Sequence, residues 1–250
     1  MSSPPFSTHR VIAKFQDLWL GLSPARLTGF ACLFFLIAFG LGYATLNRFD
    51  PRRVNYPDSV YYHDLVTGDQ VLPADVRSYR VLVPLLARPI HALAKGHVGT
   101  WDPVFFSLLV VNAALVSAAC LALLALGLRV TRDLARALLG VLLYLSNFAM
   151  VNHQLTGLVD AAESLGLLVL ALVLRAPRFE TLLLLGFLGT ASKESFLPLS
   201  LAFVAGWHYP WSSLGDQARK RLPRSLAALG VGGILSLAAT RLFVDGNVDS

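Results

Sequence analysis

The chain has 250 residues, of which 55% are hydrophobic and 14% are charged, and its mean hydropathy is +0.61. Because an average soluble domain carries about 25% charged residues, this composition excludes an ordinary soluble fold and indicates an integral membrane protein. The net charge of +6 and the pI near 9.6 do not indicate nucleic-acid binding, because the basic residues form short clusters at the ends of apolar runs.

Apolar runs along the chain predict an all-α bundle of membrane-spanning helices that forms one domain over residues 1–250. A spanning helix needs about 20 mostly apolar residues. The first run begins after residue 26 and is longer than the core of a signal peptide, so we expect it to be retained as an anchor. The expected spans cover residues 27–47, 104–128, 134–151, 158–175, 181–207 and 224–243.

The segment 48–103 is the only long hydrophilic stretch, and it lies between the first two spans. Its second half, at about residues 80–98, mixes apolar residues with arginine, lysine and histidine. This mixture predicts an amphipathic helix that lies along the membrane surface or at the outer mouth of the bundle. The segment is also rich in aspartate, with Asp50, Asp58, Asp64, Asp69 and Asp75.

Basic clusters predict the orientation in the membrane, because short cytoplasmic loops are rich in lysine and arginine. Such clusters precede the first span, separate the second from the third, follow the fourth and precede the last. If all are cytoplasmic, the N-terminus is cytoplasmic, segment 48–103 is outside, and segment 181–207 begins and ends in the cytoplasm. We therefore expect 181–207 to be a re-entrant hairpin or two short tilted helices, broken at Lys193 and Glu194. A single straight span would place the cluster at 219–224 outside, against this rule.

The stretch NYPDSVYYHDLVTGD in the outer segment is the first candidate site. Asp58 and Asp64 flank Tyr61 and Tyr62, and a carboxylate with aromatic neighbours is a common way to bind a sugar. If Asp58 begins a helix, both tyrosines follow about one turn later. The alternative is a solvated loop in which Asp58 only caps a helix.

The stretch VNHQLTGLVDAAES is the second candidate site. Asp160 and Glu163 are three residues apart, so they share a helix face. Ionisable groups inside a spanning helix must face the protein interior or a water-filled cavity, and we expect His153 to approach the same cavity. The alternative is a helix that begins one turn later and leaves both acids at the headgroups.

Lys193 and Glu194 form the third candidate site, in the middle of an apolar stretch. Lys193 either pairs with Asp160 or Glu163, or contacts an anionic phosphate together with the N-terminus of a helix that begins at Ser195. We expect three arginines at the outer interface: Arg77, Arg80 and Arg88. Arginines there either extend to lipid headgroups or bind a lipid-linked phosphate.

Four features together resemble the transmembrane module of GT-C type glycosyltransferases: an acidic first outer loop, YRVLVPLLARP, GLVDAAES and GTASKESFLPL. The resemblance covers about residues 28 to 207 and is to bacterial, mannosyltransferase-like members. It implies a polyprenyl-phosphate sugar donor and a site on the outer face of the bacterial inner membrane. It also implies that Asp58 is the catalytic base, Asp64 a secondary acid, and Lys193 a contact of the donor phosphate. We assign Tyr61, Tyr62, Arg80, His153, Asp160, Glu163, Lys193 and Glu194 to substrate binding.

Two other functions stay open. A broken helix with ionisable residues is also typical of secondary transporters and flippases, and the chain could be a non-catalytic or truncated subunit that works with a partner. No metal ligands are assigned, although a divalent cation requirement stays possible. The sequence has no Walker A, G-x-S-x-G, H-E-x-x-H or dinucleotide motif, which leaves ATP-driven pumps, serine hydrolases and zincins unsupported.

Overall fold

The computed structural model describes residues 22–46, 57–68, 79–99, 101–208 and 216–248. Every regular element within these ranges is a helix, as the sequence predicts. The elements are α2 (Pro24–Leu46), α3 (Pro57–Thr67), α4 (Leu82–Ala94), α5 (Pro103–Thr131), α6 (Leu134–Leu145), the π-helix η2 (Met150–Gln154), α7 (Asp160–Val173), α8 (Phe179–Ser192), α9 (Phe196–Trp207) and α10 (Asp216–Val248).

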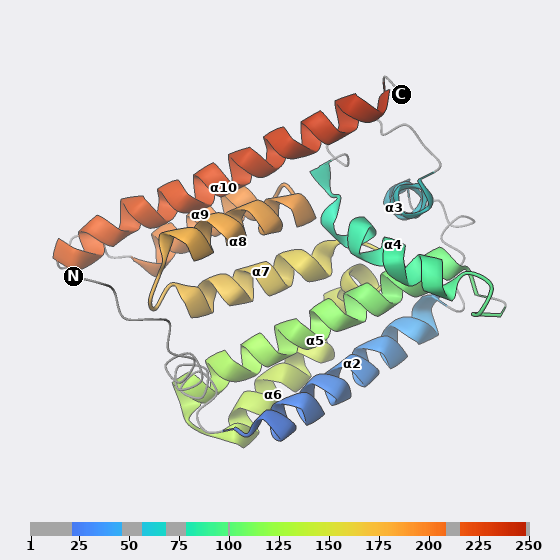
Figure 1. Cartoon of the computed structure of the whole chain (residues 1–250). Helices are drawn as coiled ribbons and strands as arrows, with labels where there is room; N and C mark the ends of the chain where they lie inside the picture. The colour runs from blue at the N-terminus through green and yellow to red at the C-terminus, as the bar shows by residue number, and fades with distance from the viewer. Residues whose placement is uncertain (1–21, 47–56, 69–78, 100, 209–215, 249–250) are drawn as a thin grey trace, which may run out of the picture.

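The long helices form two packed groups, and α7, which belongs to the second group, also contacts α5 of the first (Figure 1). In the first group, α2, α5 and α6 share a core that includes Phe34, Val116 and Val141. In the second, α7 to α10 pack around leucines such as Leu170 and Leu229. The two short helices α3 and α4 lie at one end of the molecule, close to the beginning of α5.

Small residues allow the second group to pack closely. Phe196, at the beginning of α9, is fully buried, and its ring lies against Gly166 of α7 and Gly189 of α8. A Cβ added to Gly189 would lie 2.3 Å from this ring. The two glycines therefore let Phe196 fix the position of the break between α8 and α9, which lies directly before it.

Three helices of the described residues are long and apolar enough to cross a membrane: Pro24–Ala44, Pro103–Thr131 and Arg221–Leu242. They correspond to the spans predicted at 27–47, 104–128 and 224–243. Many large apolar side chains face outward on these and on the shorter helices, among them Leu36, Leu143, Leu184, Phe203 and Ile234. Soluble proteins rarely expose so much apolar surface.

The predicted spans at 134–151 and 158–175 are not continuous helices of spanning length. α6 has 12 residues and α7 has 14, so they are about 18 and 21 Å long, against a hydrocarbon core of about 30 Å. α6 ends at Leu145, because the next two side chains bind nearby backbone groups: the Ser146 hydroxyl donates to the carbonyl of Leu143, and Oδ1 of Asn147 accepts from the N–H of Ala149. Gly157, with φ +81°, keeps the chain out of a helix before α7.

The segment predicted as a broken span, 181–207, consists of two short helices, α8 and α9, separated by residues 193–195. The predicted amphipathic segment at 80–98 is α4, with Leu85, Leu86 and Leu93 exposed. The predicted outer segment 48–103 also contains α3, while Asp50, Asp69, Asp75 and Arg77 lie outside the described residues.

The two ends of the molecule differ in charge. One end carries the start of α2, the α5–α6 and α7–α8 connections and the start of α10 (Figure 1). Its charged side chains are mostly arginines: Arg26, Arg129, Arg132, Arg136, Arg175, Arg178, Arg221 and Arg224. The other end carries α3, the starts of α4, α5 and α7, and the break between α8 and α9. Among the described residues, its acids are Asp58, Asp64, Asp102, Asp160, Glu163 and Glu194.

Candidate functional site

Arg80, directly before α4, joins two distant parts of the chain. Its Nε donates to Oε2 of Glu194 over 2.8 Å, and its Nη2 donates to Oε1 over 2.6 Å. Its Nη1 lies 3.2 Å both from Oδ2 of Asp58 and from the hydroxyl of Tyr62, both on α3. Such a two-pronged arginine–carboxylate pair is stronger and more directional than a single hydrogen bond. Arg80 therefore ties α3 to the break between α8 and α9.

Lys193 makes the second set of ion pairs, with the beginning of α7. Its Nζ lies 2.5 Å from Oδ1 of Asp160 and 3.5 Å from Oε2 of Glu163. The hydroxyl of Ser195 donates to Oε1 of Glu163 over 2.5 Å. Asp160 and Glu163 do lie on one helix face, and Lys193 pairs with both, which was one of the two alternatives left by the sequence.

These two sets form one charge cluster, defined as Asp58, Tyr62, Arg80, Asp160, Glu163, Lys193, Glu194 and Ser195. The two sets of ion pairs are joined because Lys193 and Glu194 are adjacent in the chain. Tyr62 of the first set also interacts electrostatically with Asp160 of the second. Burial raises the pKa of the Tyr62 phenol above its ordinary value, even though Arg80 donates to its oxygen. Tyr62 is therefore a neutral hydroxyl at any physiological pH.

Exposure falls from one side of the charge cluster to the other. The Asp58 side chain is 41% exposed, Lys193 is 22% exposed and Glu163 is 12% exposed. Asp58 is thus the acid that an incoming molecule would reach first. Four carboxylates and two cations leave a formal surplus of two negative charges, which disfavours an anion unless a carboxylate gives up its cation.

A second group of charged residues, His63, Asp64 and Asp102, joins α3 to the beginning of α5. Nε2 of the buried His63 lies 3.2 Å from Oδ2 of Asp102, and Nδ1 lies 3.4 Å from Oδ1 of Asp64. The other oxygen of Asp102 accepts from the backbone N–H groups of Val104 and Phe105 and so caps α5. Burial alone would raise the pKa of Asp102, but the contacts with His63 and the two N–H groups lower it to about 2.

Substitution of Asp102 separates its two roles. Asp102→Asn keeps an oxygen for the helix cap but removes the charge, whereas Asp102→Ala removes both, so we expect Asp102→Ala to be less stable by a further ~1 kcal/mol. The folded-state pKa lies below the unfolded one, so the charge stabilises above about pH 4, and this contribution is lost as the pH falls through about 2. Denaturation of both variants at pH 7 and at pH 3 tests this. An equal loss of stability in the two variants would contradict the capping role.

Three of the predicted site residues lie outside the charge cluster. Asp64 contacts His63 instead. Tyr61 is buried in the core with its ring 5.6 Å from that of Tyr62. His153 is exposed on η2, and within the described residues no hydrogen bond or ion pair connects it to the cluster. The hydrogen bond of Ser195 and the contact of His63 with Asp102 were not predicted from the sequence. Only the capping role of Asp102 could have been predicted, because an aspartate followed by proline, as in Asp102–Pro103, is typical of a helix N-terminus.

Within the part of the chain that the structure describes, no group of three or more histidine, cysteine or acidic residues is arranged to hold a metal ion. The carboxylates of the charge cluster instead face Arg80 and Lys193.

Comparison with known proteins found no matching family model, no similar curated protein and no similar solved structure.

Proposed function

We propose that the protein transfers a sugar from a lipid-phosphate donor to an acceptor hydroxyl at the outer face of a membrane. One observation carries this proposal: Asp58, Arg80 and Lys193, from three separate segments, belong to one charge cluster at the acidic end of the molecule. Sugar transfer from a phosphate uses a proton acceptor and positive charge that stabilises the departing phosphate. Asp58 would supply the first, and Arg80 and Lys193 the second.

In the proposed reaction, the acceptor oxygen attacks the anomeric carbon and its proton passes to the Asp58 carboxylate. The bond between the anomeric carbon and the phosphate oxygen breaks, and its electron pair leaves with the lipid phosphate. Asp58 suits this role because it is the most exposed acid of the cluster. The neutral Tyr62 hydroxyl, beside Arg80, is a donor for a sugar oxygen.

Binding of the donor requires that its phosphate compete with carboxylates for Lys193 or Arg80. The ammonium of Lys193 has three N–H donors, and Asp160 and Glu163 face it in the resting structure. A phosphate that displaced Asp160 from the ammonium of Lys193 would leave the Asp160 carboxylate without this cation. Because the charge cluster has a surplus of negative charge, a divalent cation could be needed to bind the donor phosphate. Activity should therefore be measured with and without added divalent cations.

We also propose that the chain is a multi-pass protein of the bacterial inner membrane with a cytoplasmic N-terminus. The arginine-rich end then faces the cytoplasm, and the charge cluster faces the outside. The short helices α8 and α9 form a re-entrant pair in this arrangement, with Lys193 and Glu194 at its apex. Their exposed leucines and phenylalanine, Leu184, Leu199 and Phe203, would contact lipid.

Asp58→Asn is the decisive substitution for the chemistry. We expect it to lower the transfer rate by about 100-fold or more, which is the usual contribution of a general base. Asp64→Asn is the matched control, because Asp64 is an acid on the same helix that contacts His63 rather than the charge cluster. The measurement is transfer of label from radioactive polyprenyl-phosphate mannose or glucose by the purified full chain, with and without Mg²⁺ or Mn²⁺. Equal losses in the two variants would contradict the role given to Asp58.

A secondary transporter is the alternative function, favoured by the interruption between α8 and α9 with Lys193 at the break and acids on the facing helix. Transporters use such interrupted helices to build substrate sites near the centre of the membrane. Uptake of label into vesicles without any transfer to an acceptor would support this alternative. Absence of both activities would favour a non-catalytic subunit.

A further inference from the structure

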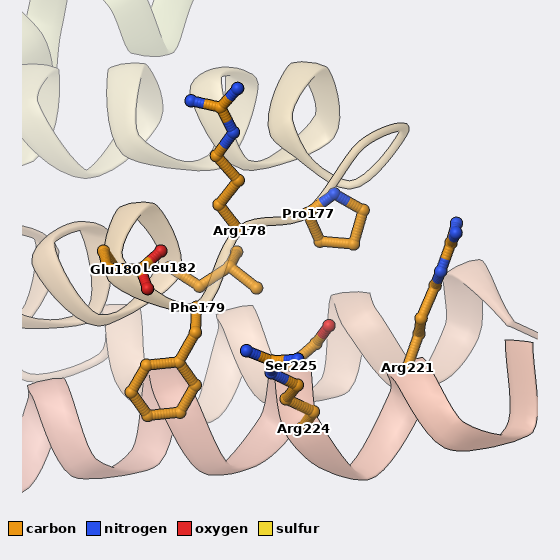
Figure 2. A pocket seen from close by; sticks show the side chains of 8 residues that line it. All are labelled: Pro177, Arg178, Phe179, Glu180, Leu182, Arg221, Arg224 and Ser225. Carbon is orange, nitrogen blue, oxygen red and sulfur yellow. The ribbon is translucent and has the colours of Figure 1, made fainter. Parts of the chain in front are cut away.

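A basic pocket lies at the other end of α8, away from the charge cluster. It occupies the space between the α7–α8 connection, the first turn of α8 and the beginning of α10, and its volume is about 250 Å³ (Figure 2). A cavity that can hold one water needs only about 10–15 Å³ by this kind of measure, so the pocket has room for a phosphate group. The pocket is lined by Pro177, Arg178, Phe179, Glu180, Leu182, Arg221, Arg224 and Ser225.

The charge of this basic pocket favours an anion. Three arginines and one glutamate line it, which gives a formal surplus of two positive charges. Arg224 is held at the pocket by Phe179, since its guanidinium carbon lies 5.9 Å from the centre of that ring. In Figure 2, Arg178 and Arg221 extend to the same side, one on each side of Pro177. Guanidinium groups bind phosphate oxygens through paired N–H donors.

A buried hydroxyl adds a second donor to the same pocket. Ser225 is 2% exposed, and its side chain points from α10 toward the space beneath Pro177 (Figure 2). Ser225 lines the pocket together with Phe179 and Arg224, and a serine hydroxyl can donate a hydrogen bond to a phosphate oxygen. The N-terminus of α8 lies beside it, and Arg178 at its cap position provides no side-chain cap, so the first N–H groups of the helix are available to an anion.

We infer that the basic pocket binds a phosphate group, as carried by the headgroup of an anionic phospholipid. The candidate span Arg221–Leu242 begins at the pocket, so a lipid phosphate lies at the same depth as the arginines when this helix crosses the membrane. Basic pockets between helices on the cytoplasmic side are known to take anionic headgroups. This site is separate from the charge cluster and does not depend on the proposed sugar transfer.

The test is a lipid titration of the full chain in detergent, with the unfolding temperature as the readout. We expect phosphatidylglycerol to raise the unfolding temperature saturably, and phosphatidylcholine, whose headgroup has no net charge, to raise it less. Arg178→Gln and the double variant Arg178→Gln/Arg221→Gln should increase the half-saturating concentration, the double variant by about tenfold, equivalent to about 1.4 kcal/mol. Both residues are exposed, so these variants are expected to fold. Ser225→Ala should weaken binding without any change in charge.

Arg136→Gln is the matched control, because Arg136 is an exposed arginine of the same end that does not line the pocket. Inorganic phosphate identifies the source of the anion. If it does not reproduce the saturable rise, the site takes a lipid headgroup; if it does, and Arg178→Gln weakens it, the site takes a soluble phosphate. The inference is overturned if Arg136→Gln weakens the response as much as Arg178→Gln does, or if phosphatidylcholine is as effective as phosphatidylglycerol.

Discussion

Arg80→Gln and Glu194→Gln are each expected to lower the free energy of unfolding by about 2 kcal/mol. Each substitution leaves a half-buried charged partner with weaker hydrogen bonds, and hydrogen bonds to charged groups contribute about 1.5–3 kcal/mol. The double variant should lose less than the sum of the two, with a coupling of about 1 kcal/mol or more, because both substitutions remove the same two hydrogen bonds. Denaturant unfolding in micelles, followed by tryptophan fluorescence, measures the free energy of unfolding of the wild type, the two single variants and the double variant.

Arg88→Gln provides the control for this double-mutant cycle. Arg88 also joins α3 to α4, but its Nε and Nη2 donate to the backbone carbonyl of Leu65 over 3.1 and 2.9 Å, not to a carboxylate. The losses of unfolding free energy caused by Arg88→Gln and Glu194→Gln should therefore be additive in the double variant. If Arg80 and Glu194 are instead additive, the pair contributes nothing specific, and the link between α3 and the α8–α9 break must come from apolar packing.

A strong Arg80–Glu194 pair has a consequence for function. It holds Asp58, on α3, next to the apex at Lys193 and Glu194, although the two lie more than a hundred residues apart in the chain. Loss of the pair should thus lower the proposed transfer activity by moving the proposed base, even though the proposed reaction gives Glu194 no proton to transfer. Such a loss would appear in both Arg80→Gln and Glu194→Gln, whereas Asp58→Asn should lower activity with a smaller change in stability.

Features that depend on length and apolarity were predictable from the sequence. The long apolar runs at 104–128 and 224–243 correspond to candidate spans because twenty or so apolar residues suffice to define one. The shared face of Asp160 and Glu163 also follows from helix geometry alone. The pairing of both with Lys193 was predictable because a charge among apolar residues needs a partner, and few opposite charges were available.

Features that depend on tertiary contacts were not predictable. Nothing local to Arg80 indicates that it meets Glu194, and the sequence favoured a contact with lipid headgroups or a phosphate instead. The end of α6 at Ser146 was missed because a window of mean hydropathy averages over two polar residues that stop the helix. In the sequence, His63 belongs to a motif rich in tyrosine and aspartate. Its contact with Asp102 could not be predicted, because it depends on how α3 packs against α5.

Gly232→Ala is expected to destabilise the fold by about 1–3 kcal/mol or more, the usual cost of overpacking. A Cβ at Gly232 of α10 would lie 2.1 Å from the carbonyl oxygen of Leu183 and 2.9 Å from the backbone nitrogen of Phe187, both on α8. These are backbone atoms, so no side-chain rotation can relieve the clash, and the two helices must move apart. Small residues at such positions let membrane helices approach closely.

Gly230→Ala, two residues earlier in α10, is the control with the opposite expected sign. A Cβ there has no atom within 4 Å, and alanine is favoured over glycine inside a helix by about 0.5–1 kcal/mol. Gly230→Ala should therefore raise the unfolding free energy while Gly232→Ala lowers it. Equal effects would mean that α8 and α10 are not in backbone contact. Because α8 connects the basic pocket to the charge cluster, Gly232→Ala should also weaken both the proposed phosphatidylglycerol binding and the proposed sugar transfer, whereas Arg178→Gln should weaken only the lipid binding.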